Sequence, residues 1–331
     1  MTFQSESLPR PADAREIVSG LSARLASIRS APWFAKMLRV VGWVWPLALV
    51  GYLAIYLVSL GWGQIWQSLP TSWIFFALIP VLYVLPAAGD LIIYRHIWGT
   101  GDKLRLPVML HKNAINTAFI GMSGEVYLVM WARRHVGLPQ RFLLHSVTDS
   151  NALSTVAGWL LLSSLLIYLA VSGNWAIPLL PADSLWVALA AAAVPTGLFA
   201  LVLIARRIPT VLSGRQLAFA FSVHAVRTAI GYTLLVSIWS VALPSVPLSL
   251  WLNFLALRLL VSSLAILPNR ELLWLGAGVG LAGIMDMPSA GIAAVLITMT
   301  AGEYICHLLF VGLPTLTSKL RLAFAAPRTA G

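Results

Sequence analysis

The chain has 331 residues, of which 59% are hydrophobic and 10% are charged, and its formal net charge is +11. Soluble domains contain about 25% charged and about 45–50% apolar residues. Between Arg39 and Asp90 no charged residue occurs, so a soluble fold could not cover this apolar surface, and we expect an integral membrane protein. The basic residues fall in short stretches between apolar segments, which favours membrane orientation over nucleic-acid binding.

Residues 1–39 contain six Lys or Arg side chains and lack the apolar core of a secretory signal. Within them, Ile17, Leu21, Leu25 and Ile28 recur at helical spacing. This pattern predicts a basic amphipathic helix on the cytoplasmic surface of the membrane. A frayed tail is the alternative.

Apolar runs long enough to cross a bilayer follow, joined by short loops. They are residues 40–61, 71–93, 154–172, 184–205, 217–243, 249–268 and 289–313, with a shorter glycine-rich run at 272–288. The sequence therefore predicts an all-α, polytopic membrane protein with about eight transmembrane helices. We expect the membrane domain to cover residues 40–315 and a short basic tail to cover 316–331. Basic residues at both ends predict that both termini are cytoplasmic.

Residues 108–131 are less apolar than the predicted spans. They include Asn113, Asn116, Gly121 and Glu125, and basic residues flank them on both sides. Because both flanks belong on the cytoplasmic side, a re-entrant or broken polar helix fits better than a crossing. Spanning and re-entrant forms stay open for this stretch and for 272–288.

The two halves of the chain share a weak sequence similarity. Glu125 is followed by the turn VGLPQRFLLHSV, and Glu271 is followed by the turn IMDMPSAGIAAVL. Paired irregular segments in the halves of a transporter often mark a binding site near the bilayer midplane. This similarity favours an inverted repeat. The alternative is that the short matching residue combinations occur in both halves by chance.

Four motifs occur in order along the chain: YRHIWG around Arg95, NTAFIGMSGE ending at Glu125, WARRHVGLPQRFLLHSVTDSNAL, and LPNRELLWLGAGVG with MPSAGIAAVL. They resemble the flippase-like membrane domain family that also forms the membrane part of lysylphosphatidylglycerol synthases, over residues 40–315. The chain departs from the family at Met122 and Ser123, where Pro and Gly are frequent, and it lacks the family's glycines between Pro268 and Arg270.

The resemblance implies a helical membrane domain that translocates a lipid. The synthases also carry a soluble aminoacyl-transferring domain, for which this sequence leaves no residues. The resemblance therefore implies the lipid-translocating half without the aminoacyltransferase.

Arginines inside predicted spans are candidate contacts for a lipid headgroup, because an Arg near the bilayer centre costs about 2.5–3.5 kcal/mol to insert. Arg258 and Arg227 are both deep in such spans and could hold a phosphate through bidentate hydrogen bonds. The alternative is an ion pair that locks helices together, with Glu125, Glu271 or Asp149 as the acidic partner.

Polar residues near the predicted breaks complete the candidate site. A carboxylate at a break could accept hydrogen bonds from exposed backbone N–H groups or pair with an arginine as the site opens and closes. The predicted substrate-binding residues are Asn116, Glu125, Arg134, Asp149, Arg227, Arg258 and Glu271.

Glu303 and His307 are spaced i to i+4 in the last predicted span and form a candidate proton relay, with a plain interhelical hydrogen bond as the alternative. The sequence contains no HExxH, GxSxG, Walker A or DDxxD motif, and its single cysteine, Cys306, lies in an apolar run. We therefore expect no catalytic residues, metal site or cofactor.

These observations favour a transporter that moves an anionic phospholipid or a lipid-linked glycan between the leaflets of a bacterial inner membrane. Its partners would be membrane lipids, and either a second copy or a lipid-synthesising enzyme. A membrane-embedded lipid-modifying transferase is one alternative, with Glu125 or Asp149 as general base. A non-transporting scaffold of an envelope-lipid complex is the other.

Overall fold

The computed structural model describes residues 51–317 except 52–53, 56, 119–121, 176–209, 264–269 and 286, and it describes no side chains for 261–273. The contacts below all lie within the compact unit of residues 55–331. The predicted surface helix in 1–39, the span at 184–205, most of the span at 40–61 and nearly all of the tail at 316–331 lie outside the described residues.

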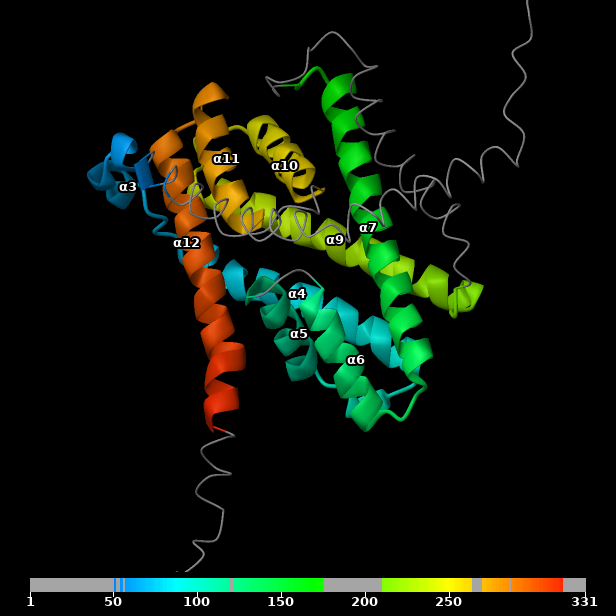
Figure 1. The fold of residues 1–331 in the computed structure, drawn as a ribbon. Helices are drawn as coiled ribbons and strands as arrows, with labels where there is room; N and C mark the ends of the chain where they lie inside the picture. Colours follow the sequence, from blue (N-terminus) through cyan, green and yellow to red (C-terminus); the bar gives the residue numbers. More distant parts are fainter. Residues whose placement is uncertain are drawn as a thin grey trace, which may run out of the picture. The chain divides into compact units, whose positions relative to one another are not determined.

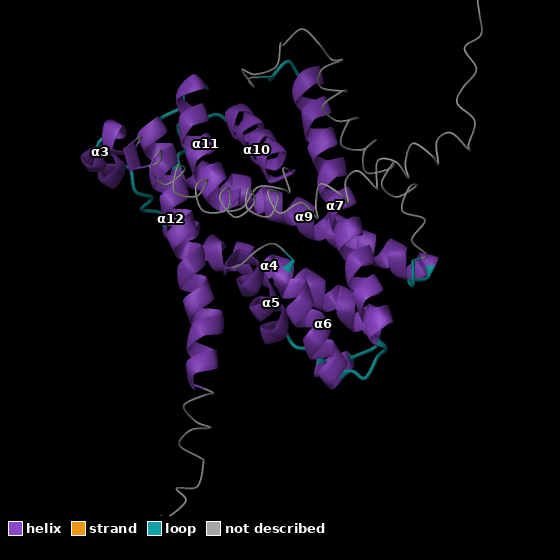
Figure 2. Ribbon diagram, viewed as in Figure 1, coloured by secondary structure: helices purple, strands orange, loops and turns teal. Residues whose placement is uncertain are grey.

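Every regular element among the described residues is helical (Figure 2). In chain order the elements are α3 (Trp62–Gln67), α4 (Trp73–Trp98), η1 (Gly101–Lys103), α5 (Leu106–Ala118), α6 (Ser123–His135), α7 (Gln140–Val171), α9 (Gly214–Ala242), α10 (Leu248–Ser263), α11 (Arg270–Ile284), α12 (Ser289–His307) and the π-helical turn η2 (Leu308–Gly312) (Figure 1). The all-α prediction is confirmed for this part of the chain.

Four helices in the described ranges are long and apolar enough to cross a membrane: α4, α7, α9 and the helix that runs from Ser289 through α12 and η2 to Thr317. The shortest, α4, has 26 residues, so at 1.5 Å per residue it is about 39 Å long and exceeds a hydrocarbon core of about 30 Å. The predicted span 289–313 falls within the last of them, and 71–93, 154–172 and 217–243 extend beyond α4, α7 and α9 by no more than two residues. Helices α10 and α11 are shorter, with 16 and 15 residues.

The polar stretch at 108–131 is broken into two helices, α5 and α6, which lie side by side (Figure 1). Met122 precedes α6 in the left-handed region, with φ 80°. Gly124 allows the two helices to pack closely, because a Cβ atom there would overlap the backbone carbonyl of Lys112. Each helix has 13 residues, or about 20 Å, so neither alone reaches across a bilayer.

Helices α4 and α9 pack antiparallel along much of their length. Near one end the rings of His96 and Phe219 are 4.1 Å apart, and further along Gly89 faces Arg227. A Cβ atom on Gly89 would come within 2.5 Å of Cδ of Arg227. The missing side chain at Gly89 is therefore what lets Arg227 cross the surface of α4.

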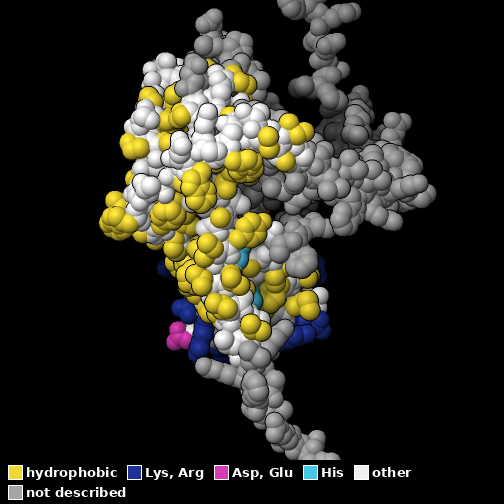
Figure 3. Space-filling view, turned by 90° about the vertical axis from the view of Figure 1, so that its left-hand side faces the viewer, with side chains coloured by type: hydrophobic (Ala, Val, Ile, Leu, Met, Phe, Trp, Pro, Cys, Tyr) yellow, Lys and Arg dark blue, Asp and Glu magenta, His cyan; other side chains and the backbone are white. Residues whose placement is uncertain are grey.

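A hydrophobic core joins one end of α4, α5, α6, α7 and α9, with Tyr94, Met109, Leu128, Leu143 and Ala220 among its buried members. Exposed basic residues follow the helix ends around this core: Lys103, Arg105, Arg133, Arg134, Arg141 and Arg215. Figure 3 shows Lys and Arg side chains gathered at one end of the visible face and hydrophobic side chains covering much of the rest. This separation is what the charge distribution of a membrane protein requires.

Candidate functional site

A cavity of about 580 Å³ lies among α4, α5, α6, α7, α9, α10, α11 and α12. Small-molecule sites commonly have volumes of about 300–1,000 Å³. Its described lining combines apolar side chains with charged, amide and aromatic groups. The cavity therefore has both the size and the polarity of a ligand site.

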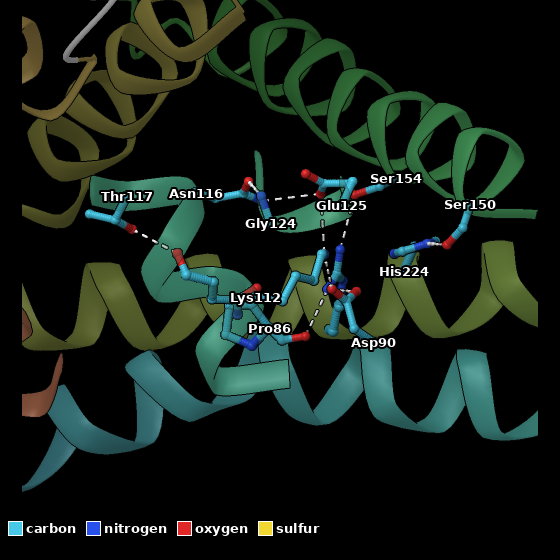
Figure 4. Close-up of polar contacts among 12 residues, drawn as sticks. Pro86, Asp90, Lys112, Asn116, Thr117, Gly124, Glu125, Ser150, Ser154 and His224 are labelled. Atoms are coloured by element: carbon cyan, nitrogen blue, oxygen red, sulfur yellow. Dashed lines mark hydrogen bonds and ion pairs between the residues drawn. The ribbon is translucent and has the colours of Figure 1, made fainter. Parts of the chain in front are cut away.

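Asp90 is the centre of a buried group of charges on one wall of the cavity. Its Oδ2 accepts a hydrogen bond from Nζ of Lys112 and its Oδ1 accepts one from a guanidinium N–H of Arg227, both at 2.6 Å. The Lys112 ammonium also lies 3.4 Å from Oε1 of Glu125 (Figure 4). We call Asp90, Lys112, Glu125 and Arg227 the ionic cluster. Two acidic and two basic groups balance, which offsets much of the cost of removing each charge from water.

Lys112 lies in α5, outside the four long helices. Burial by itself would lower the pKa of its amine, but the negative charge of Asp90 acts in the opposite direction, and Tyr94 and Glu125 add to it. The pKa of Lys112 is consequently raised above its usual value. The lysine stays charged and holds the two carboxylates together.

Arg227 is fixed by three groups on two neighbouring helices. Besides Asp90, its guanidinium donates to the Pro86 carbonyl oxygen at 2.9 Å and to the Ser154 hydroxyl at 3.0 Å. One turn away, His224 shares a 3.0 Å hydrogen bond with Ser150. These contacts tie α9 to both α4 and α7.

Asn116 positions Glu125 across the α5–α6 hairpin. Its side-chain amide donates to Oε1 of Glu125 at 3.1 Å, and its carbonyl oxygen accepts from the Gly124 N–H at 2.7 Å. Oε2 of Glu125 is buried and has no hydrogen-bond partner in the described structure (Figure 4). Because an unpaired buried polar group costs about 1–3 kcal/mol, or more when charged, this oxygen calls for an additional donor.

Another part of the cavity lining is aromatic and cationic. The Arg258 guanidinium carbon lies 5.5 Å from the centre of the Trp274 ring, in cation–π geometry. Trp239 stacks on Trp251 and also contacts Trp274, with ring centres 5.5 and 6.5 Å apart. The buried indole N–H groups of these three tryptophans have no hydrogen-bond partner in the described structure. Trp239 and Trp274 line the cavity with Arg258. We call the three tryptophans the aromatic wall.

A third group lines the cavity where α12 faces α4. The Tyr83 hydroxyl and Nδ1 of His307 share a 2.8 Å hydrogen bond, and Nε2 of His307 lies 3.7 Å from Oε1 of Glu303. The π-helical turn η2 begins immediately after His307. Such turns often occur at functional sites, because they alter the register of the side chains that follow.

The structure brings six of the predicted residues to the cavity: Asn116, Glu125, Arg227, Arg258, Glu303 and His307. Arg134 is exposed at the end of α6, outside the cavity lining. Asp149 also lies outside the lining and accepts hydrogen bonds from the Thr210 hydroxyl and the Val211 N–H. The side chain of Glu271 lies outside the described residues.

Sequence reasoning missed the two residues at the centre of the ionic cluster. Lys112 is not among the predicted site residues, and the acidic partners expected for the arginines are Glu125, Glu271 or Asp149, not Asp90. A usable signal was present, because Asp90 is the first charged residue after a long uncharged run and falls within a membrane-length helix. The aromatic wall gave no such signal, since tryptophans are common in any membrane sequence.

Comparison with protein-family models, curated proteins and solved structures finds no match to this chain. Among the described residues no three His, Cys, Asp or Glu side chains gather in a way that could hold a metal ion.

Proposed function

We propose that this protein is a lipid translocator that receives a lipid headgroup in the central cavity and passes it between the leaflets of a bacterial inner membrane. The observation that carries the proposal is the position of a charged, hydrogen-bonding cavity among four membrane-length apolar helices. Acyl chains can stay in the surrounding lipid while the polar headgroup is sheltered from it. The resemblance to the flippase-like membrane domain family points to the same activity.

In this mechanism the hairpin of α5 and α6 is re-entrant and forms the moving wall. Lys112 lies between two carboxylates, 2.6 Å from Asp90 and 3.4 Å from Glu125. A shift of the hairpin against α4 would separate Lys112 from Asp90, while Lys112 keeps Glu125 on the same hairpin and Asp90 keeps Arg227. No charge would be left unpaired, which makes two arrangements of the cavity accessible. We further propose eight spans, an inverted repeat and cytoplasmic termini, on the basis of the hydropathy and charge pattern.

Arg258 would contact the headgroup from the part of the cavity lining that holds Trp274. Its guanidinium lies over the Trp274 ring at the cavity, whereas the guanidinium of Arg227 is hydrogen-bonded to α4 and α7. Glu303 and His307 would link headgroup movement to protons. Asp90, Lys112 and Arg227 of the ionic cluster would hold the helices together, and Arg258 with the tryptophans beside it would recognise the headgroup.

A lipid-modifying transferase is the second candidate. It is supported by Glu125, a cavity-lining residue whose Oε2 has no hydrogen-bond partner among the described residues and which could act as a general base. Asp149 is less suited to this role, because it lies outside the cavity lining and is hydrogen-bonded to the segment before α9.

Leaflet-resolved lipid analysis distinguishes the two. Cells with and without the protein are treated with a membrane-impermeant reagent for headgroups, and their lipids are quantified by mass spectrometry. Translocation predicts a lipid whose total amount is unchanged but whose outer-leaflet share falls when the protein is absent. Disappearance of that lipid would favour the transferase, and no change in any lipid would count against both.

A further inference from the structure

The charged groups that line the cavity cancel one another. Asp90, Glu125 and Glu303 are acidic, and Lys112, Arg227 and Arg258 are basic. With histidine neutral, the described lining thus carries no formal net charge. A ligand that brings a net charge into this low-dielectric space would leave it uncompensated, whereas a neutral polar ligand would not.

The ionic cluster also leaves one strong hydrogen-bond acceptor unused. Glu125 is 9% exposed. Its Oε1 accepts a hydrogen bond from Asn116 and forms an ion pair with Lys112, whereas its Oε2 has no hydrogen-bond donor among the described residues. A carboxylate oxygen of this kind is satisfied by an O–H or N–H group of a ligand.

The remaining polar lining is built from amides and hydroxyls. Asn113 and Asn116 from α5, Asn151 and Ser154 from α7 and Thr228 from α9 share the cavity with Glu125. Each can exchange hydrogen bonds with a hydroxyl, which is both donor and acceptor. Such groups suit a ligand that presents several hydroxyls around its edge.

Aromatic rings in the cavity lining add a second kind of contact that a sugar can make. Trp239 and Trp274 line the cavity, and their indole N–H groups are unpaired in the described structure. A sugar ring has C–H faces that pack against an aromatic surface and hydroxyls that accept from an N–H. The carboxylate and amides therefore match the hydroxyls of a sugar, and the tryptophans match the C–H faces of its ring.

We propose that the headgroup taken by this cavity is an uncharged sugar, so that the substrate is a glycosylated lipid, with Oε2 of Glu125 accepting a sugar hydroxyl. This inference rests on the proposed function, because it names the substrate class of the same cavity. Of the two classes expected from the sequence, it selects the glycan over the anionic phospholipid.

The test is a lipid competition measured by native mass spectrometry. The full chain is purified in a detergent without a sugar headgroup, since a maltoside would compete for the site. It is then mixed with equal amounts of monoglucosyl-diacylglycerol, phosphatidylglycerol and diacylglycerol that carry the same acyl chains. We expect the glucosyl lipid to bind at least tenfold more tightly than the other two.

Three variants connect binding to the cavity. Glu125→Gln keeps an oxygen for Asn116 and removes the charged acceptor, so the preference for the glucosyl lipid should fall about tenfold, the equivalent of one charge-assisted hydrogen bond. Asn151→Ala lies on α7, outside the ionic cluster, and should reduce the preference several-fold even if Glu125→Gln does not fold. Arg134→Gln, on the same helix as Glu125 but exposed outside the cavity, is the matched control and should bind as the unaltered protein does.

The outcomes separate this inference from the proposed function. Tighter binding of phosphatidylglycerol, lost in Arg258→Gln, would overturn the sugar assignment and leave lipid translocation in place. If all three lipids bind equally and Glu125→Gln, Asn151→Ala and Arg258→Gln have no effect, the cavity does not distinguish headgroups. That result would count against both the sugar assignment and the proposed translocation.

Discussion

Asp90 and Arg227 are 137 positions apart in the sequence, and their side chains meet at 2.6 Å between antiparallel helices α4 and α9. Because Gly89 leaves room beside it, the arginine reaches across α4 to both Asp90 and the Pro86 carbonyl. The pair thus depends on a glycine and an acid that are adjacent in sequence. It joins the two helices that carry much of the cavity wall.

Removal of the acid should be strongly destabilising. Asp90→Asn leaves Lys112 and Arg227 with one carboxylate between them, and removal of one partner from a buried ion pair costs about 3–5 kcal/mol. Unfolding can be followed with a thiol-reactive dye, because Cys306 is the only cysteine and is buried. The double variant Asp90→Asn, Lys112→Gln should recover part of the loss; a single variant as stable as the unaltered protein would contradict the central role of Asp90.

Close packing of the α5–α6 hairpin should depend on Gly124. Gly124→Ala places a methyl group against the Lys112 carbonyl, and we expect a loss of about 1–3 kcal/mol in unfolding free energy. Gly158→Ala, within α7 with no atom near the added methyl, is the control and should be neutral or slightly stabilising because alanine favours helices. Equal effects of the two variants would show that the hairpin contact is not tight.

Arg258 should be needed for transport but not for folding. Arg258→Gln removes the cation over Trp274, whose interaction with the ring is worth about 0.5–2 kcal/mol. We expect transport of a fluorescent lipid in proteoliposomes to fall at least tenfold while the protein still accumulates and loses no more than about 2 kcal/mol of unfolding free energy. Arg258→Lys should retain part of the activity, since it keeps a cation without the planar guanidinium. Undiminished transport in Arg258→Gln would remove the support for this role.

His307 should be required for proton coupling if Glu303 and His307 form a relay. His307→Gln removes the titratable ring between Tyr83 and Glu303, so transport should lose its response to an imposed pH gradient. Tyr83→Phe removes only the hydrogen bond to Nδ1 and should keep that response. If both variants alter stability alone and the unaltered protein ignores the gradient, the contact is a plain interhelical hydrogen bond.

The sequence could predict those features that depend on local composition. Long apolar runs separated by basic loops predicted membrane helices, and α4, α9 and α12 lie where expected, because hydrophobic length is a property of each segment alone. The polar residues of 108–131 likewise predicted a re-entrant or broken helix there, and in the structure one helix ends at Ala118 and the next begins at Ser123. Polar and charged residues inside the spans indicated Arg227, Arg258, Glu303 and His307 as candidate site residues, and all four line the cavity.

The tertiary structure alone decided which of these residues meet. Asp149 and Arg134 are as polar as Glu125, but helix rotation and register place only Glu125 at the cavity. Ion-pair partners such as Asp90 and Arg227 are fixed by the antiparallel packing of distant helices, which hydrophobic periodicity does not encode. The aromatic wall of Trp239, Trp251 and Trp274 is assembled in the same way from three helices. Composition therefore determined the long apolar helices, and long-range packing determined the cavity among them.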